Sequence, residues 1–335
     1  MRPAEAAKNA LECVLEAKKG ERLVIFCDDV RSDVGDAFHE GAKALELKTQ
    51  LVMLETSEVV FRNKLSFENQ RFLTTERPDI YINLLRGIRE ETPFRISIIH
   101  SETGDHKARL GHCPGISMDM LTEGALALTG GEHRVMQAFA GKLMENLSDA
   151  TAIEVTNTAG TNLTFSVENR AFFTDTRIDW KTMKWMNLPT GEVIVAPVET
   201  SLQGKLVCDM AIGGIGPIDT PFIIEVEDGS VQTAFSRDSD VQKRVAESLA
   251  TDDMAKVVGE FAFGINPKAR FVEEFLETEK IEGTVHIAFG DNLDYPSGQN
   301  NSANHMDFLI RSPNVTVRKR NSSALEVLSA GVFQI

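Results

Sequence analysis

Basic side chains are scarce in this sequence of 335 residues. Its 35 lysines and arginines stand against 50 aspartates and glutamates, which gives a formal net charge of −15. Binding to nucleic acid or to an anionic membrane surface requires a basic face, so this balance argues against both kinds of partner. No stretch approaches the roughly 20 apolar residues that a membrane helix needs. Residues 1–20 also lack the apolar segment of a secretory signal peptide, and we therefore expect a cytoplasmic protein.

Cysteine is equally sparse, and nucleotide-binding motifs are missing. No cysteine pair forms a C-x-x-C motif, and the four are scattered along the chain: Cys13, Cys27, Cys113 and Cys208. This usage predicts reduced, buried thiols rather than a disulfide framework. Neither G-x-G-x-x-G nor a P-loop follows the acidic pair Asp28 and Asp29, so the sequence gives no basis for a nucleotide site there.

The first 145 residues alternate between helical and strand patterns. Helical spacing covers residues 4–18 and 34–45. Short apolar runs predict strands at residues 22–27, 49–54, 79–85 and 95–100. Strands that alternate with helices are typical of a doubly wound parallel sheet, so we predict an α/β domain over residues 1–145.

The pattern changes near residue 150. Residues 151–156 and 161–167 alternate in polarity around Asn157-Thr158-Ala159-Gly160, which predicts a β-hairpin. Further short strands are expected at residues 192–196, 205–211, 222–226, 231–235, 284–289, 305–310 and 315–317. One helix is expected over residues 239–261. We therefore predict a second domain over residues 146–335, of the α+β class and mainly antiparallel β.

Two histidines and an aspartate supply the first candidate site residues. His305 and Asp307 are two apart in an expected strand, so their side chains project to the same face and could share a metal ion. His286 lies inside the apolar run Val285 to Phe289. A lone histidine in such a run is more often a core residue, but His305 and Asp307 follow 19 and 21 residues later.

Two glutamates extend this set. Glu260 lies between Val258 and Phe261, where a carboxylate is costly to desolvate without a partner. A metal ion would be such a partner; the alternative is a glutamate that reaches water at a helix end. Glu192 follows a proline-containing loop at the start of an expected strand, and taken alone it reads as a surface glutamate.

Together these residues allow two kinds of metal site. His286, His305 and Asp307 alone suit a mononuclear Fe(II) site with two histidines and one carboxylate. With Glu192 and Glu260 added, the oxygen ligands suffice for two divalent ions that share a bridging carboxylate, an arrangement suited to amide hydrolysis. The C-terminal domain is thus expected to be metal-binding.

Four segments, in order and at similar spacings, resemble the aminopeptidase T family of thermophilic leucyl aminopeptidases. They are NLPTGEVIVAP (187–197), GEFAFGINP (259–267), TEKIEGTVHIAFGDN (278–292) and NHMDF (304–308). The resemblance implies a homodimer that acts on small peptides and binds two divalent ions, as zinc, cobalt or manganese. It places the metal ligands at Glu192, Glu260, His286, His305 and Asp307. It also implies an active-site tyrosine at Tyr295 and a general base at Glu279 or Glu282, of which we prefer Glu279.

Three functions follow from these observations. The first is a metal-dependent aminopeptidase that removes N-terminal residues from peptides. The second is an Fe(II)-dependent ring-cleaving dioxygenase of the 2,5-dihydroxypyridine dioxygenase type, in which a histidine stands at the position of Glu260 and the histidine at the position of His286 is lost. The third is a protein that binds a peptide or metal without turnover, because the loop between His286 and His305 is shorter than in the well-known peptidases.

Overall fold

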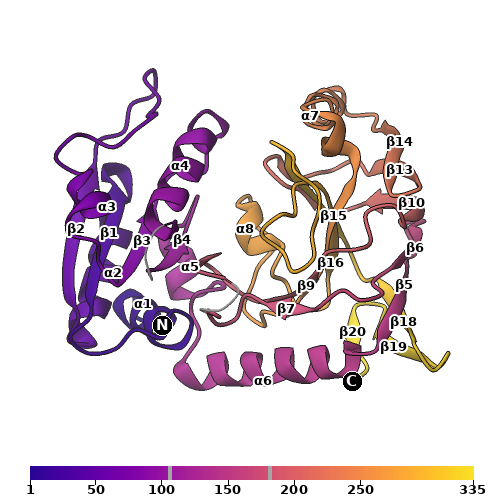
Figure 1. Cartoon of the computed structure of the whole chain (residues 1–335), viewed down its shortest axis with the longest axis horizontal. Coiled ribbons are helices and arrows are strands. Elements are labelled where there is room, and N and C mark those ends of the chain that lie inside the picture. The colour runs from indigo at the N-terminus through magenta and orange to yellow at the C-terminus, as the bar shows by residue number, and fades with distance from the viewer. Residues whose placement is uncertain (105–107, 180–182) are drawn as a thin grey trace. The chain divides into compact units, whose positions relative to one another are not determined.

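The structure, a computed structural model, describes residues 1–104, 108–179 and 183–335. They form two compact units, each drawn in Figure 1. The first unit contains Met1–Gln137 and Asp175–Thr190, and the second contains Ala138–Thr174 and Gly191–Ile335. The expected domains, 1–145 and 146–335, stay a prediction about independently folding parts of the chain.

A five-stranded parallel sheet forms the centre of the first unit, in the strand order β2-β1-β3-β4-β8. Its strands are β1 (Arg22–Asp28), β2 (Lys48–Leu54), β3 (Ile80–Leu84), β4 (Arg109–His112) and β8 (Trp185–Asn187). All five residues of β3 are buried, as expected for a strand that is covered on both faces. The predicted parallel sheet of the N-terminal part is thus confirmed.

Helices cover both faces of this sheet. They are α1 (Pro3–Cys13), α2 (Ser32–Ala44), α3 (Arg71–Thr74), α4 (Thr92–Thr103) and α5 (Met118–Thr122), with the 3₁₀ turns η1 (Asp29–Arg31) and η2 (Arg89–Glu91). Leu23 and Ile25 of β1 pack in one apolar core with α1 and α2, whereas Val24 and Phe26 pack in another with α3 and α4. The chain passes from the first unit into the second within α6 (Gly130–Leu147).

The fourth predicted strand, residues 95–100, is wrong, because this segment lies within helix α4. Pro93 stands in the first turn of that helix, where its missing N–H costs nothing. Phe94, Ile98 and Ile99 then recur at helical spacing and pack against the sheet. The fourth parallel strand is β4, which has only four residues.

The second unit consists of two antiparallel sheets, which confirms the mainly antiparallel prediction. The eight-stranded sheet runs β14 (Ser230–Phe235), β13 (Phe222–Glu227), β10 (Gln203–Cys208), β6 (Asn162–Ser166), β5 (Ala150–Thr156), β18 (Asn314–Lys319), β19 (Ala324–Ser329) and β20 (Val332–Phe333). The seven-stranded sheet runs β12 (Gly216–Pro217), β11 (Ala211–Ile212), β17 (His305–Ile310), β16 (Val285–Gly290), β15 (Val258–Gly264), β9 (Glu192–Val195) and β7 (Phe173–Thr174). Aromatic rings join the two sheets: Phe165 lies 5.1 Å from Phe261, and Phe222 lies 5.9 Å from Phe308, between centroids.

The helix predicted over residues 239–261 is only partly correct. Helix α7 (Ser239–Leu249) begins at Asp238, whose side chain accepts hydrogen bonds from two backbone N–H groups, and is followed by η3 (Asp253–Lys256). Residues 258–261 belong to β15, and α8 (Phe275–Thr278) comes later. Glu260 therefore lies in a central strand with 3% of its surface exposed, so its reading as a helix-end residue that reaches water is wrong.

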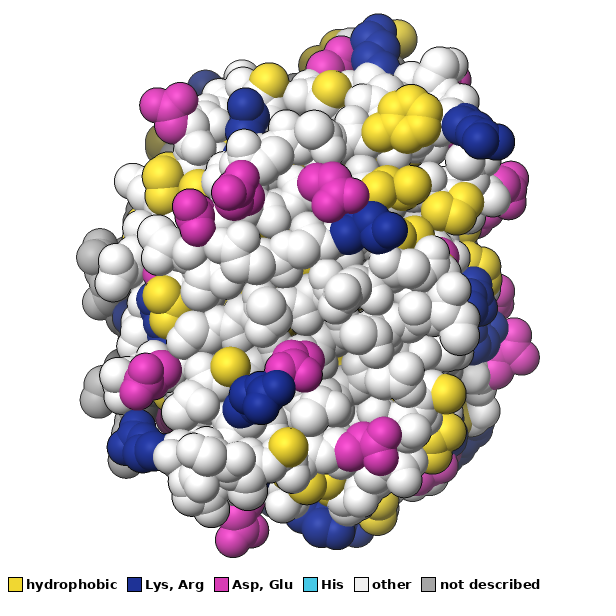
Figure 2. Space-filling model, turned by 90° about the vertical axis from the view of Figure 1, so that its right-hand side faces the viewer, with side chains coloured by type: hydrophobic (Ala, Val, Ile, Leu, Met, Phe, Trp, Pro, Cys, Tyr) yellow, Lys and Arg dark blue, Asp and Glu magenta, His cyan; other side chains and the backbone are white. Residues whose placement is uncertain are grey.

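Charge on the molecular surface agrees with the composition. On the face that Figure 2 shows, acidic and basic side chains are interspersed, and the basic ones do not gather into a patch of the kind that nucleic acid requires. Among the residues that the structure describes, no helix combines the length and apolar character needed to span a bilayer.

Candidate metal centre

Five candidate residues project from one face of the seven-stranded sheet. Their strand partners establish this, because residues opposite each other in a ladder share a face and residues two apart along a strand do too. The relevant pairs are Gly264↔Glu192, Ala262↔His286, Glu260↔Ala288, Ala288↔Asp307 and Gly290↔His305. We call Glu192, Glu260, His286, His305 and Asp307 the acid–histidine cluster.

Small residues make room for this cluster. Ala262, Gly264, Ala288 and Gly290 are the cluster's neighbours on the same face. The alternate positions hold large apolar side chains that are buried in the core: Phe261, Phe263, Ile287, Phe289 and Phe308. One face of the sheet is therefore built for packing and the other for polar chemistry.

A bulge at Gly259 sets the direction of Glu260. The register of β15 against β16 shifts between Val258 and Glu260, so Gly259 is the inserted residue. A Cβ atom at Gly259 would lie 2.7 Å from the carbonyl oxygen of Gly290. Only glycine fits this close approach, and without the inserted residue Glu260 would project to the other face.

The side chains of the cluster lie at the separations of a metal-ligand shell. His286 Nε2 lies 3.3 Å from Glu260, 3.6 Å from Glu192 and 3.8 Å from Asp307. His305 Nε2 lies 3.1 Å from Glu260 and 3.3 Å from Asp307. Two ligands that are each about 2.1 Å from one ion are roughly 3.0–3.4 Å apart in octahedral or tetrahedral geometry. Three of the five separations fall in this range, those of Glu260 from both histidines and of Asp307 from His305, and the other two exceed it by at most 0.4 Å, so the residues fit a site for divalent metal.

Hydrogen bonding prepares His305 for this role. Its Nδ1 lies 2.8 Å from the carbonyl oxygen of Asp291, which can only accept, so Nδ1 carries a proton. When the ring is neutral, Nε2 then presents a lone pair toward Glu260 and Asp307. Such a partner on the far ring nitrogen is the usual support of a histidine ligand.

The negative charge of the cluster's carboxylates favours bound cations, either protons on the histidines or metal ions. Burial lowers the pKa of His305, but Asp307 and Glu260 outweigh this effect and hold it well above its usual value. Burial likewise opposes the ionised form of Glu260, but hydrogen bonds from His286 and His305 lower its pKa. Without metal, protons on the imidazoles balance the carboxylates, so metal binding would displace protons.

Glu279 lies beside the cluster, but Glu282 is exposed to solvent. One oxygen of Glu279 falls within 4.8 Å of ligand atoms from Glu192 and His286. Burial raises the pKa of Glu279 to about 8 against the lowering effect of Lys280, and the carboxylate of Glu192 raises it too. Of the two sequence candidates for a general base, the structure thus brings only Glu279 to the site.

Lys280 is the residue that sequence reasoning missed. Its Nζ lies 2.5 Å from Glu192 and 2.7 Å from Glu279, and its side chain is buried. A lysine in the polar stretch Thr278-Glu279-Lys280 is expected to be exposed to solvent. In the sequence, only its position next to Glu279 indicates that it could belong to the site. Its ammonium group holds two carboxylates of the site in a fixed relation.

Tyr295 reaches the cluster from the loop between β16 and β17. Its hydroxyl donates a hydrogen bond of 2.6 Å to Glu260. Its ring packs against Phe173 of β7, with 5.2 Å between centroids. The tyrosine expected from the sequence is therefore in contact with the candidate ligands.

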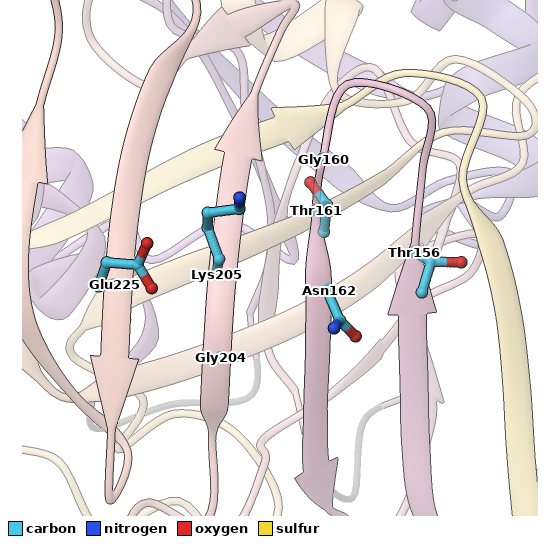
Figure 3. Close-up of a pocket in the computed structure, with 7 residues that line it drawn as sticks. All are labelled: Thr156, Gly160, Thr161, Asn162, Gly204, Lys205 and Glu225. Carbon is cyan, nitrogen blue, oxygen red and sulfur yellow. The ribbon is translucent and has the colours of Figure 1, made fainter.

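A separate hollow lies on the eight-stranded sheet, and Figure 3 shows its lining. The lining residues come from β5, β6, β10, β13 and the β5–β6 turn: Thr156, Gly160, Thr161, Asn162, Gly204, Lys205 and Glu225. This lining contains neither histidine nor cysteine, and it has one carboxylate, Glu225, which alone does not form a metal site. The acid–histidine cluster is accordingly the stronger candidate for chemistry.

Comparisons with known proteins point the same way. The family model described as thermophilic metalloprotease (M29) matches residues 133–333, a stretch that includes every member of the cluster. No curated protein sequence matches the chain. The structure of wild-type AmpT from Thermus thermophilus shares 15% identity, covers 99% of both chains and gives a TM-score of 0.72. The structure of 2,5-dihydroxypyridine dioxygenase from Pseudomonas putida KT2440 shares 16% identity, covers 99% of this chain and 96% of its own, and gives 0.70. At these identities the two likenesses show a common fold.

Proposed function

The chain belongs to the thermophilic metalloprotease (M29) family, and from that premise we propose that it is an aminopeptidase with a dinuclear divalent metal centre. The observation that carries the proposal is the acid–histidine cluster, whose possible ligand atoms lie 3.1–3.3 Å from one another on one face of a sheet. The resemblance of its sequence segments to aminopeptidase T supports the choice of an N-terminal exopeptidase.

Two overlapping groups of side chains, which share His286, bring possible ligand atoms within 4.8 Å of one another. One group is Glu192, Glu279 and His286, and the other is Glu260, His286 and Asp307. Glu260 lies 3.3 Å from His286 and 3.1 Å from His305, closer to both than Asp307 at 3.8 and 3.3 Å, so it is the carboxylate best placed to bridge. We propose Glu192, Glu260, His286, His305 and Asp307 as the ligands and zinc, cobalt or manganese as the metal. When bound, such ions polarise a scissile carbonyl and lower the pKa of water.

The chain's own residues supply the proton transfers. In its ionised form, Glu279 is proposed to take the proton from the attacking water and pass it to the leaving amine. Lys280 keeps the carboxylate of Glu279 oriented toward the site. Tyr295 is proposed to stabilise the negative charge that develops on the carbonyl oxygen by donating a hydrogen bond from its hydroxyl.

The cysteines and the sequence resemblance bear on the enzyme's location and oligomeric state. Cys27, Cys113 and Cys208 are buried free thiols, as in proteins of a reducing compartment, which supports a cytoplasmic location. The sequence resemblance supports a homodimer that acts on small peptides. Light scattering coupled to size exclusion tests the dimer, which would give twice the mass of one 37.0 kDa chain.

Metal analysis and activity assays together test the proposal. Purified protein should contain about two divalent ions per chain and should release nitroaniline from a panel of amino-acid nitroanilides. Chelation should abolish this activity, and zinc, cobalt or manganese should restore it. One iron per chain with oxygen uptake on 2,5-dihydroxypyridine would instead establish the dioxygenase. Bound metal with no hydrolysis of any anilide would establish a binding protein.

Replacing Glu260 by glutamine tests the bridging assignment. The amide removes one charge from the shared carboxylate, so both ions should bind less tightly. We expect hydrolysis to fall at least about 100-fold, because even residues that only support ligands cost 10–100-fold in metal affinity. Metal content per chain should fall in parallel. Wild-type turnover in Glu260→Gln would end the assignment.

A further inference from the structure

Tyr295 lies on the loop of residues 291–304, which is tied to β15 through two asparagines: Asn292 donates to the carbonyl oxygen of Gly259 at 3.1 Å, and Asn300 donates to that of Val258 at 2.9 Å. Within residues 291–304, Leu293, Asp294 and Ser297 are exposed on the turn that carries the tyrosine. This turn is closed by short-range bonds, from Tyr295 N to Asn292 O at 3.0 Å and from Gly298 N to Tyr295 O at 3.0 Å. These bonds shape the turn, and the two asparagines tie its ends to the strand that carries Glu260.

An ion pair from two other segments contacts the turn between these ends as well. Arg170 lies between β6 and β7, and Glu199 follows β9. Arg170 Nη1 lies 3.1 Å from Glu199 Oε1, and Arg170 Nη2 donates to Glu199 Oε2, so the guanidinium grips the carboxylate with both nitrogens. Such two-bonded pairs are geometrically specific as well as strong. We call Arg170 and Glu199 the clamp.

The clamp holds the tyrosine turn at three points. Arg170 Nη1 donates to the carbonyl oxygen of Ser297 at 2.5 Å. Glu199 Oε1 accepts from the backbone N–H of Gln299 at 3.0 Å and from the side chain of Asn292 at 3.3 Å. These contacts bracket Tyr295 on both sides in the chain.

Burial makes the clamp effective. The side chains of Arg170 and Glu199 are 7% and 12% exposed, so water screens the pair little. Phe173, three residues after Arg170, packs on the ring of Tyr295. The segment that carries the cation thus also supports the tyrosine ring.

We propose that the Arg170–Glu199 clamp positions Tyr295, holding its hydroxyl at hydrogen-bond distance from Glu260 and from the reacting carbonyl of a peptide. The second part rests on the proposed function. Arg170 and Glu199 are positioning residues, because their side-chain hydrogen bonds go to each other and to the tyrosine turn and not to the candidate ligands.

Fluorine NMR tests the positioning directly. The chain has two tyrosines, Tyr81 and Tyr295, so protein labelled with 3-fluorotyrosine gives two signals that Tyr295→Phe assigns. Glu199→Gln should shift or broaden the Tyr295 signal and leave the Tyr81 signal unchanged. An unchanged Tyr295 signal would overturn the proposal whatever the enzyme's activity.

Kinetics test the functional consequence. Glu199→Gln should lower kcat about tenfold, a part of the 10²–10³-fold that one oxyanion donor contributes, with little change in KM or metal content. In a Tyr295→Phe background the same substitution should have no further effect on kcat. An equal loss in both backgrounds would show a merely structural role and overturn the proposal. Full activity of Tyr295→Phe alone would refute the proposed role of Tyr295, while the NMR result on the clamp would stand.

Two further variants keep the test decisive. Arg170→Lys retains the charge but loses the two-nitrogen contact with the carboxylate, so its effects on the Tyr295 signal and on kcat should lie between those of wild type and Glu199→Gln. It also replaces Glu199→Gln if that variant fails to fold. The matched control is Glu154→Gln, which breaks the exposed ion pair of Glu154 with Arg318 in the same unit. The control should change neither the Tyr295 signal nor kcat. A change in either would show that the effects of the clamp variants are not specific to the clamp, and would overturn the proposal.

Discussion

Glu279 and Glu282 are three residues apart but differ completely in surroundings. Glu279 is buried beside Lys280, whereas Glu282 faces solvent. As the proposed general base, Glu279 should matter to proton transfer, so Glu279→Gln should lower kcat by about 10²–10⁴-fold with the metal content retained. Glu282→Gln is the matched control and should stay within about twofold of wild type. Steady-state kinetics on an amino-acid nitroanilide compare the two, and the opposite ranking would transfer the role to Glu282.

Glu102 in the first unit allows a prediction about stability and pH. Burial raises the pKa of this carboxyl well above its usual value, and the side chain of Asn83 donates to it at 2.8 Å. The folded chain therefore keeps a proton that the unfolded chain loses above about pH 4.3. Stability contributed by this group is present below that pH and declines as the pH rises toward the raised pKa, by at most about 1.4 kcal/mol per pH unit.

Glu102→Gln should remove this decline, because glutamine stays neutral and its oxygen can still accept from Asn83. Denaturant unfolding at pH 5 and pH 7.5 should show a variant whose advantage over wild type grows with pH. The exposed Glu58→Gln serves as control and should show no such trend. A constant difference at the two pH values would contradict a proton retained on Glu102.

Some residues of the site could be predicted from the sequence, and others could not. His305 and Asp307 were found because strand periodicity alone puts them on one face. Glu260 stood out because a carboxylate among Val and Phe must find a partner. Lys280 gave no comparable signal, since a lysine in a polar stretch looks solvated and only folding shows the two carboxylates that surround it.

At the scale of elements, the division of labour between the two sheet faces is testable. Ala288 lies on the polar face between Glu260 and Asp307, and Ile287 beside it lies in the core. Ala288→Val should crowd the cluster and lower metal affinity at least tenfold, measured by calorimetric titration of metal-free protein. Ile287→Val should leave metal affinity unchanged but lower the free energy of unfolding by about 0.5–1.5 kcal/mol. Equal effects on metal affinity would contradict the assignment of faces.

The elements that were mispredicted share one physical cause. Residues 95–100 and 258–261 are short apolar runs, and periodicity over so few residues does not separate a buried strand from a buried helix segment. Pro93 decides the first case by starting helix α4, and the bulge at Gly259 accompanies the strand in the second. Longer alternating segments, such as the hairpin of β5 and β6, were predicted correctly because their pattern extends over more residues.

At the scale of the whole molecule, the proposed ligands belong to one unit only. Metal removal should therefore affect the stability of the two units differently. All five lie within Gly191–Ile335, and none lies in the first unit. A ligand that binds only the folded state at 100 times its Kd adds about 2.7 kcal/mol of stability. Chelation should therefore destabilise the second unit in particular. Without metal, only protons and Lys280 would neutralise the carboxylates of the cluster.

Hydrogen exchange with and without chelator measures this effect segment by segment. We expect amides of β9, β15, β16 and β17 to lose protection by at least about tenfold on metal removal, since these strands carry the cluster. Amides of β1 and β3, in the core of the parallel sheet, should exchange as before, which makes them the internal control. Because loss of the ions alone should cause the change, adding back zinc, cobalt or manganese should restore protection in the four strands. Equal loss in β1 and β3 would mean that the metal stabilises the chain as a whole, and no loss in β9 and β15 would remove Glu192 and Glu260 from the set of ligands.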